Sequence, residues 1–426
     1  MRAGILVTGT EVLSGAVSDR NGPWLSARLQ RLGIGVAEIR IVGDRDADIA
    51  DALEGMRAHH LGLVVTTGGL GPTADDRTVA QVARWLSAEL ILNTDLEERI
   101  REIVRPLRER GVAAAAAFDA GNRKQATVPA GSVIIDPVGT APGLVIAPPR
   151  EGYPTTVVLP GPPRELQPMF EQAISKEPFA RLLAKLEPAE VRTMRLFALP
   201  ESELAQGLRE AAEAGVELER LEVSTCHHRG ELEITTRVPP DALSIYEALE
   251  SFMRERYGER LFSTDGRSID EILASALSGR LTIATAESCT GGMLAARLTE
   301  LPGASSWVLG GVIAYSNEVK VRSLRLDAGV LEREGAVSEA VARALAEGVR
   351  EILGASIGVG VTGIAGPGGG SERKPVGLVW LAVAGPGGST LARSVRLPGG
   401  RAEIRERAVT VAMHLVRQAV ESRANV

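Results

Sequence analysis

Residues 61–78 read LGLVVTTGGLGPTADDRT, and this stretch decides the fold of the first third of the chain. The apolar and β-branched run over Leu61–Thr67 has the length of a buried strand, and the glycines after it permit a tight turn. We expect a helix after Pro72, whose positive end faces the same ligand as the turn. Short apolar runs alternate with helical spacing on both sides, which predicts a mostly parallel sheet covered by helices. The other strands expected here are Ala3–Val7, Gly35–Val42, Ser132–Ile135, Leu144–Ile146 and Thr156–Leu159.

The pattern changes twice along the chain and predicts three domains. Residues 1–170 form an α/β domain, residues 171–262 a small α+β domain, and residues 263–426 a second α/β domain. The middle segment has strand patterns at 191–198, 218–224 and 231–238 and helical patterns at 201–214 and 241–257. In the last segment, helices at 269–277, 317–324, 338–353 and 402–421 alternate with strands at 281–285, 308–315, 356–361 and 377–384.

Composition excludes several classes of function. The 426 residues carry a net charge of −6 and only 3% aromatic residues, which argues against a nucleic-acid partner. Two cysteines far apart in sequence exclude a disulfide framework and a four-cysteine zinc site. We therefore expect a cytoplasmic protein with no membrane partner, because no apolar run approaches the ~20 residues of a membrane span.

Three polar, glycine-rich loops follow the predicted strands of the first domain. Because ligands of open α/β sheets bind at the carboxyl ends of strands, we expect these loops to face one site. Glycine lets backbone amides approach a phosphate closely, so a phosphorylated ligand is favoured. The candidate binding residues are Gly9, Glu11, Asn21, Gly68, Gly69, Gly71, Pro72, Thr73, Asp76, Gly139, Gly143 and Gly161.

Carboxylates accompany these loops and favour a divalent cation, which would lie between them and a phosphate. The candidate metal ligands are Asp19, Asp75, Asp76 and Glu165. An alternative for Asp75 and Asp76 is that they cap the helix that begins near Arg77, where carboxylates are stabilised by the helix dipole.

The last domain combines hydroxyl groups with one lysine near its predicted strand ends. The segment 286–292 reads AESCTGG, and YSNEVK follows at 315–320, whereas all five histidines lie outside these loops. A Ser–His–Asp triad is therefore not available locally, and acyl transfer would need a serine with a neutral lysine as base. Lys320 lies in the first turn of a predicted helix, where the dipole opposes a positive charge and favours that role.

The strings TGTEVLSG, GGLGPTADDRT, NRKQATVPAGS, GTAPG and LPGPPRE resemble the molybdopterin-binding fold, and among its members the N-terminal domain of the CinA (competence- and damage-inducible) family. The resemblance implies a metal-dependent ADP-ribose pyrophosphatase that yields AMP and ribose 5-phosphate. Molybdopterin handling is disfavoured, because molybdopterin proteins lack the remainder of this chain.

The strings AESCTGG, PGASS, YSNEVK, GAVSE, VTGIAGPGGGS, KPVGLVW and GGR resemble the C-terminal domain of the same family, which includes nicotinamide mononucleotide deamidase. The resemblance implies hydrolysis of the carboxamide to a carboxylate, without a cofactor. It gives Ser305 as nucleophile and Lys320 as base, with Ser288 as the second choice of nucleophile. The remaining expected site residues are Tyr315, which orients or protonates, Ser288 and Thr362, around the amide or phosphate, and Thr290, Gly291, Gly292, Gly366, Gly368, Gly369 and Arg401, which hold the phosphate.

Three classes of function remain open. The first is a hydrolase with both activities, and the second is an enzyme active at one end only. The third is an accessory of DNA uptake or repair, which the net charge disfavours. We expect a homodimer. Arg401, Arg405, Arg407 and Arg417 of the last helix are interpreted as a solvated face, and His227 and His228 as an exposed hairpin.

Overall fold

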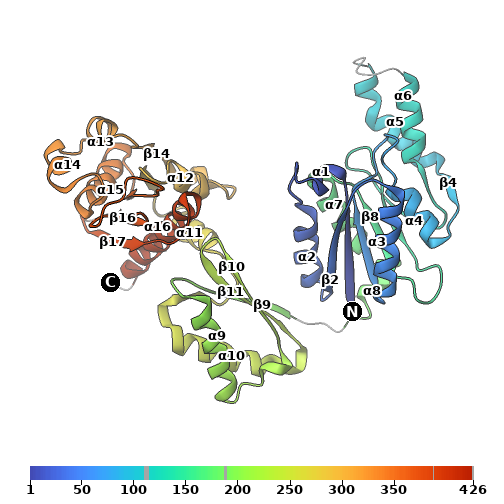
Figure 1. The fold of residues 1–426 in the computed structure, drawn as a ribbon, viewed down its shortest axis with the longest axis horizontal. Coiled ribbons are helices and arrows are strands. Elements are labelled where there is room, and N and C mark those ends of the chain that lie inside the picture. The colour runs from blue at the N-terminus through green and yellow to red at the C-terminus, as the bar shows by residue number, and fades with distance from the viewer. Residues whose placement is uncertain (110–114, 187–189, 387, 425–426) are drawn as a thin grey trace. The chain divides into compact units, whose positions relative to one another are not determined.

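The computed structural model describes residues 1–109, 115–186, 190–386 and 388–424, which fall into two compact units, Met1–Val191 and Arg192–Val426 (Figure 1). The second unit holds both the sheet expected for the middle domain and the sheet of the last domain. The domain limits at residues 170 and 262 stay predictions.

The first unit is built on a six-stranded sheet in the order β2-β1-β3-β8-β7-β6. The first four strands run parallel, and the last two are antiparallel. Every residue of β3 is buried, as expected for a strand with helices on both faces. All the strands predicted for this sheet are therefore confirmed. Their bounds are β1 (Arg2–Thr8), β2 (Gly35–Val42), β3 (Leu63–Thr67), β6 (Val133–Ile135), β7 (Gly143–Ile146) and β8 (Thr155–Leu159).

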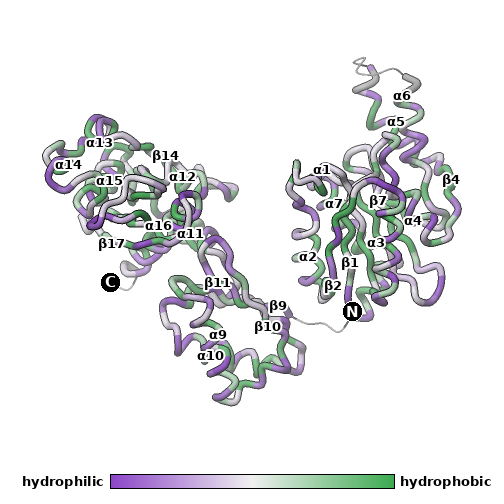
Figure 2. Tube along the Cα trace, viewed as in Figure 1, coloured by the Kyte–Doolittle hydropathy of each residue, from purple (hydrophilic) through white to green (hydrophobic). Residues whose placement is uncertain are grey.

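Helices cover both faces of this sheet, and the green strands of Figure 2 lie between them. One core joins the sheet to α2, α7 and α8, and the other joins it to α3, α4 and α5. The bounds are α1 (Thr10–Leu13), α2 (Asn21–Arg31), α3 (Asp46–Ala58), α4 (Thr78–Leu86), α5 (Thr94–Glu109), α6 (Ala115–Gln125), α7 (Pro163–Ile174) and α8 (Phe179–Leu183), with a small ladder of β4 (Leu90–Leu92) and β5 (Thr127–Pro129).

The second unit begins with a four-stranded sheet in the order β10-β11-β9-β12, against which α9 and α10 pack. The predicted strand over 218–224 is only partly correct, because Leu218–Arg220 form a 3-10 turn and the strand starts at Glu222. The bounds are β9 (Glu190–Leu196), α9 (Glu201–Glu213), β10 (Glu222–His228), β11 (Glu231–Val238), α10 (Leu243–Tyr257) and β12 (Leu261–Ser263).

A five-stranded sheet follows in the order β14-β13-β15-β16-β17, with the first three strands parallel. Its cores join α11, α12 and α16 to one face and α13 and α15 to the other. The edge strand β17 was not predicted, because its half-exposed pattern breaks the apolar run. The bounds are α11 (Ile269–Leu277), β13 (Ile283–Glu287), α12 (Met293–Leu298), β14 (Val308–Ile313), α13 (Asn317–Leu324), α14 (Ala328–Glu334), α15 (Glu339–Leu353), β15 (Ile357–Gly363), β16 (Leu378–Ala384), β17 (Thr390–Arg396) and α16 (Arg401–Ala424).

Candidate functional site

A pocket of about 750 Å³ lies at the carboxyl ends of the parallel strands of the first unit. Of the predicted ligand-binding residues, the lining includes Gly9, Glu11, Asn21, Gly68, Gly69, Gly71, Asp76 and Gly161. The three loops therefore do meet at one site. The lining also includes residues that were not on the predicted list: Arg20, Asp44, Gln125 and Thr140.

Four predicted residues do not line this pocket. Gly143 opens β7 and packs against Ile135 and Met169, so it serves the core. Gly139 faces the carboxylate of Glu165, which a Cβ on Gly139 would approach to 2.5 Å. The other two, Pro72 and Thr73, lie in the turn before α4.

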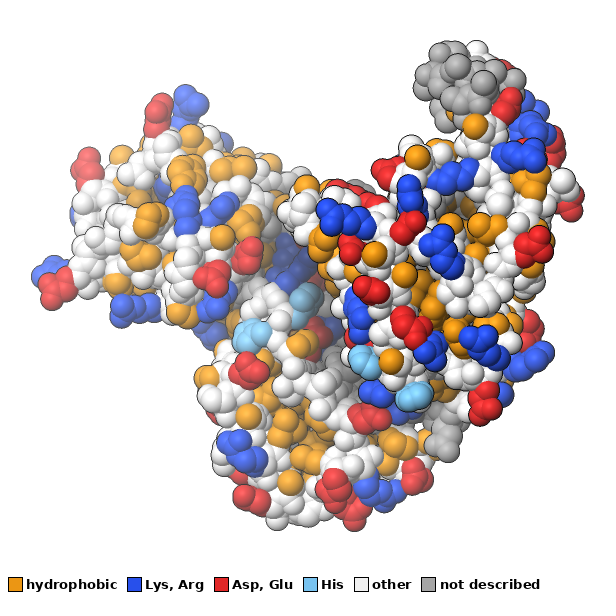
Figure 3. All heavy atoms as spheres, turned by 45° about the vertical axis from the view of Figure 1, so that its right-hand side comes forward, with side chains coloured by type: hydrophobic (Ala, Val, Ile, Leu, Met, Phe, Trp, Pro, Cys, Tyr) orange, Lys and Arg blue, Asp and Glu red, His pale blue; other side chains and the backbone are white. Residues whose placement is uncertain are grey.

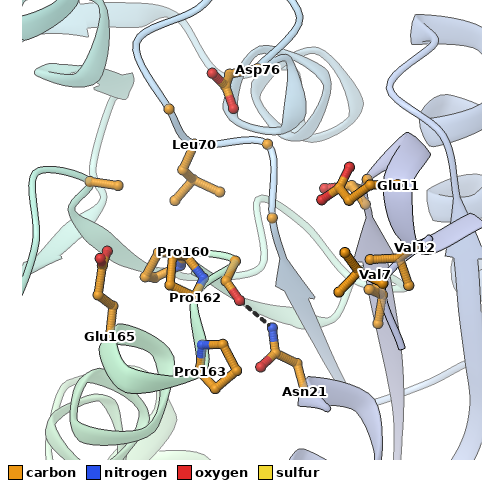
Figure 4. A pocket seen from close by; sticks show the side chains of 18 of the residues that line it. Val7, Glu11, Val12, Asn21, Leu70, Asp76, Pro160, Pro162, Pro163 and Glu165 are labelled. Atoms are coloured by element: carbon orange, nitrogen blue, oxygen red, sulfur yellow. Dashed lines mark hydrogen bonds between the residues drawn. The ribbon is translucent and has the colours of Figure 1, made fainter. Parts of the chain in front are cut away.

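Three carboxylates of the pocket stand apart from one another. Figure 4 shows Glu11, Asp76 and Glu165 on three different sides, and the described ranges contain no group of three potential metal ligands. Asp19 accepts hydrogen bonds from the amides of Asn21 and Gly22 at 2.9 and 3.1 Å, so it also caps α2.

Local hydrogen bonds also hold the turn before α4. The carboxylate of Asp76 accepts from the backbone amide of Thr73 at 3.0 Å and from its hydroxyl. Lys124 donates to the Thr73 carbonyl, and burial lowers the pKa of its amine.

The donor set nevertheless fits a hard cation that takes one or two protein ligands and completes its shell with phosphate and water. Six carboxylates and a single arginine line the pocket, so an anionic ligand needs such a counter-charge. Asn21 supports a ligand here, because its side-chain nitrogen donates to Thr67 and Gly161 while its buried oxygen has no hydrogen-bond partner among the described residues.

The second candidate site lies where β13, β14 and β15 of the five-stranded sheet end. Lys320 of α13 is only 1% exposed, and its Nζ donates to the carbonyl oxygen of Tyr315 at 3.2 Å. Burial lowers the pKa of this amine, and the nearby Cys289 opposes that shift. Within the described ranges Lys320 forms no ion pair with a carboxylate that would offset this effect of burial.

The predicted pair of Ser305 and Lys320 is wrong for a single chain. Ser305 lies in the short turn Ala304–Ser306 before β14, whereas Lys320 follows the end of that strand. The carbonyl of Trp307 accepts from the amide of Ile283 at the start of β13, and the preceding residue, Ser306, contacts Ser278 at 3.5 Å. The two predicted catalytic residues thus lie beyond opposite ends of β14, a strand of six residues and about 20 Å in length.

Ser288 and Lys320 lie at the same end of the strands. It follows β13 directly, and the amide of Ala314 donates to the carbonyl of Glu287, so the two strand ends are adjacent. Ser288 is half-buried, whereas the neighbouring Cys289 is 6% exposed and burial raises the pKa of its thiol to about 11. The thiol is therefore a poor nucleophile here, and Ser288 is the accessible hydroxyl.

The predicted phosphate-binding amides of the 288–292 turn are already used within the chain. The amide of Gly291 donates to the carbonyl of Ser288 at 3.2 Å, and that of Gly292 donates to the carboxylate of Glu287 at 3.0 Å. Thr290 is fully buried. The amides of Gly291 and Gly292 are therefore not free to hold a phosphate, and the expectation is wrong for these two amides. The Thr290 hydroxyl has no hydrogen-bond partner among the described residues, so its predicted role stays a prediction.

Arg401 and Tyr315 meet at the carboxyl ends of these strands. The guanidinium of Arg401, at the start of α16, donates to the carbonyl of Gly366 at 2.8 Å and to the Tyr315 hydroxyl at 2.9 Å. Thr362 is 1% exposed and donates to the carbonyl of Ala336 at 2.7 Å. The loop after β15 also carries Gly368 and Gly369, which are exposed.

Comparisons with known proteins agree with both halves of the fold. Residues 267–420 match the family described as "CinA C-terminal domain", and residues 4–181 match "Probable molybdopterin binding domain". A CinA-like protein of Mycolicibacterium vanbaalenii is 53% identical over 421 residues, which cover 98% of each chain. The chain belongs to the CinA family. A CinA-like protein of Mycobacterium tuberculosis is 52% identical over 98% of this chain and 97% of its own.

A crystal structure of a competence/damage inducible protein from Agrobacterium tumefaciens covers 36% of this CinA-family chain and 93% of its own, at 39% identity and a TM-score of 0.35. In the described part of the molecule, no helix has both the length and the apolar character needed to cross a bilayer. On the face drawn in Figure 3, basic and acidic side chains are interspersed.

Sequence reasoning missed two residues of this CinA-family site, Glu287 and Arg405. Arg405 was interpreted as part of a solvated face, but its guanidinium donates to the carbonyls of Cys289 and Thr290. Arg417 is also buried rather than solvated. The sequence of α16 carries no signal for these contacts, because residues 408–417 are all buried and the helix has no single apolar face. His227 and His228 are exposed, as expected.

Proposed function

We propose that the C-terminal part of this chain is an amidase that deamidates nicotinamide mononucleotide, with Ser288 as nucleophile and Lys320 as general base. The observation that carries the proposal is the buried Lys320 amine, which has a backbone carbonyl as partner and no paired carboxylate in the described residues. Such an amine is unprotonated in a larger fraction of molecules at neutral pH than a solvated lysine is, so it is more available as a general base. Ser288 is the half-buried hydroxyl at the same strand ends.

The first half of the reaction forms an acyl-enzyme. Lys320 Nζ takes the proton of the Ser288 hydroxyl while the serine oxygen bonds to the carboxamide carbon. When the tetrahedral adduct collapses, the C–N bond breaks. The proton on Nζ passes to the departing nitrogen, which leaves as ammonia.

The second half uses water. Nζ takes one proton from a water molecule as its oxygen bonds to the acyl carbon, the ester C–O bond breaks, and the proton returns to Ser288. The sum is carboxamide plus water to carboxylic acid plus ammonia. Arg401 supports phosphate binding, because its planar guanidinium matches phosphate oxygens and is exposed at this edge.

The decisive measurement is ammonia release from nicotinamide mononucleotide by the full chain. Ser288→Ala and Lys320→Ala should each lower kcat by roughly 10³-fold or more. Ser305→Ala is the matched control and should keep kcat within about threefold. A reversed order, with Ser305→Ala inactive and Ser288→Ala active, would make Ser305 the nucleophile, and wild type without ammonia release would refute the activity.

We also propose that the pocket of the first unit hydrolyses ADP-ribose to AMP and ribose 5-phosphate with a divalent cation. The carboxylate-rich lining and the unpartnered oxygen of Asn21 support this assignment. When bound, the cation would neutralise phosphate charge and act as a Lewis acid. Its candidate ligands are Asp19, Asp75, Asp76 and Glu165. We further propose that the protein works in the cytoplasm as a homodimer.

Chelation separates the two activities. EDTA should abolish AMP release and leave ammonia release unchanged, because no metal enters the proposed amidase chemistry. Asp76→Asn should lose roughly 10²-fold of AMP release and keep ammonia release, and Lys320→Ala should do the opposite. Loss of both activities in one variant, with the fold intact, would contradict two independent sites.

A further inference from the structure

The turn between β13 and α12 is held from outside by one arginine. Arg405 Nε donates to the carbonyl oxygen of Cys289 at 3.0 Å, and its Nη2 donates to that of Thr290 at 2.9 Å. A single guanidinium edge thus spans two consecutive peptide groups, which its planar fork of donors allows. Arg405 lies 116 residues after Cys289, so only the packing of α16 beside this turn brings them together.

Glycine makes this approach possible. Gly291 has a φ of +62°, and a Cβ built on it would lie 3.3 Å from Arg405 Nη2. The guanidinium therefore passes close to the backbone at the point where the chain turns in the left-handed region.

The opposite side of the turn is held by Glu287. This carboxylate is 1% exposed and accepts from the amides of Gly292, Leu294 and Ala295 at 3.0, 3.0 and 2.8 Å. The carbonyls of the turn thus accept hydrogen bonds from the Arg405 guanidinium, and the amides that follow donate to the Glu287 carboxylate. The segment that carries Ser288 has little freedom left.

We propose that Arg405 is a positioning residue that holds the 288–292 turn so that the Ser288 hydroxyl stays in its attacking position. A peptide group is planar and trans, so fixing the carbonyls of Cys289 and Thr290 also fixes the N–H groups of Thr290 and Gly291. The cation also offsets two carbonyl dipoles beside the place where negative charge develops on the carboxamide oxygen. The catalytic part of this inference depends on the proposed amidase function.

The two cysteines of the chain allow a test that does not depend on activity. Cys226 is exposed, and Cys289 lies buried inside the turn. In a Cys226→Ser background, Arg405→Ala should make Cys289 react roughly tenfold faster with a thiol reagent, because the turn opens more often. Arg407→Ala is the matched control, since Arg407 is on the same helix and forms no hydrogen bond to this turn in the described structure; its rate should not change.

Kinetics with nicotinamide mononucleotide then separate positioning from general stability. Arg405→Ala should lower kcat by about 10–100-fold with KM within about threefold, and Arg405→Lys should not restore it, because an ammonium lacks the two-donor fork. Added guanidinium should recover kcat in Arg405→Ala and have no effect on Arg407→Ala.

Each outcome decides the inference. Thiol reactivity equal to that of Arg407→Ala overturns the clamp itself. Faster thiol reaction with unchanged kcat, or lowered kcat that guanidinium does not rescue, overturns the positioning role. Wild type without ammonia release refutes the proposed function and with it the catalytic role, while the thiol comparison still decides whether Arg405 holds the turn.

Discussion

At the scale of single residues, Lys320 shows how burial changes chemistry. Its amine is removed from water and has the Tyr315 carbonyl as hydrogen-bond acceptor at 3.2 Å. Burial disfavours the charged form and lowers the pKa of the amine. A lysine whose pKa is lower in the folded state than in the unfolded state lowers the free energy of unfolding at every pH where the unfolded chain carries that lysine protonated. This cost fades as pH rises through the folded pKa towards the ordinary value of 10.5.

Replacing this amine should therefore separate stability from activity. Lys320→Met keeps most of the apolar stem, and it should unfold at the same or a higher temperature than wild type at pH 7 while losing ammonia release. The stability advantage should shrink as pH is raised towards 10. Thermal unfolding at several pH values measures this advantage, and Arg322→Met, an exposed residue of the same helix, serves as the control. A variant less stable than wild type at every pH would show that the amine stabilises the fold.

At the scale of elements, β15 and α15 pack unusually closely. A Cβ on Gly358 would lie 2.0 Å from the carbonyl oxygen of Ala346, and one on Gly360 would lie 2.2 Å from that of Ala342. The strand backbone therefore lies directly on the helix, and small residues on both elements make the contact possible. This packing positions the end of β15, where Thr362 meets Ala336.

Adding one methyl group should break this contact. Gly360→Ala should lower the free energy of unfolding by roughly 2–3 kcal/mol, because neither the helix carbonyl nor the strand can move freely. Gly368→Ala is the control, since a Cβ there meets no atom within 4 Å, and it should change stability by less than about 0.5 kcal/mol. Urea unfolding of both variants measures the difference. Equal midpoints would mean that helix and strand separate at little cost.

At the scale of the whole second unit, a buried polar pair joins the four-stranded sheet to the last helix. Nε2 of His414 on α16 lies 2.6 Å from Oε1 of Glu231 on β11, and both residues are at most 2% exposed. Phe197 stacks on the imidazole at 3.7 Å, and the hydroxyl of Thr410 donates to the carbonyl of Arg229. The hairpin of β10 and β11 is therefore anchored on the last helix.

This pair should make stability depend on pH. Burial raises the pKa of Glu231 from 4.5 to about 7 and lowers the pKa of His414. The acid with a raised pKa contributes its full stability below pH 4.5 and loses it as pH rises through 7. Glu231→Gln keeps an uncharged partner, so its stability relative to wild type should rise by roughly 3 kcal/mol over this window.

Denaturant unfolding at pH 4.5, 6 and 7.5 measures the difference in free energy of unfolding between Glu231→Gln and wild type. Glu219→Gln, which replaces an exposed acid of the same unit, should differ from wild type by the same amount at every pH. A gap for Glu231→Gln that does not grow with pH would mean that Glu231 is ionised throughout. The histidine contribution has the opposite sign, since a lowered pKa costs stability below the ordinary value of 6.5 and this cost disappears as pH rises.

The sequence by itself determined most of the elements and the family. The helices Ile269–Leu277 and Asn317–Leu324 and the strand Glu231–Val238 were predicted residue for residue, because caps, periodicity and alternation are local properties. The family motifs were likewise readable from order and spacing. The sequence also gives the order of Ser305, β14 and Lys320 along the chain. This order implies that Ser305 and Lys320 lie at opposite ends of the strand.

Only the tertiary structure decided which side chains meet. The site requires Arg405 to approach Cys289 across 116 residues, and the anchoring pair spans 183 residues from Glu231 to His414. Such contacts depend on how a helix packs on a sheet and on which atoms are buried there, and no local pattern encodes either. Burial then changes the chemistry, since removal from water lowers the pKa of the Lys320 amine and keeps the Cys289 thiol protonated.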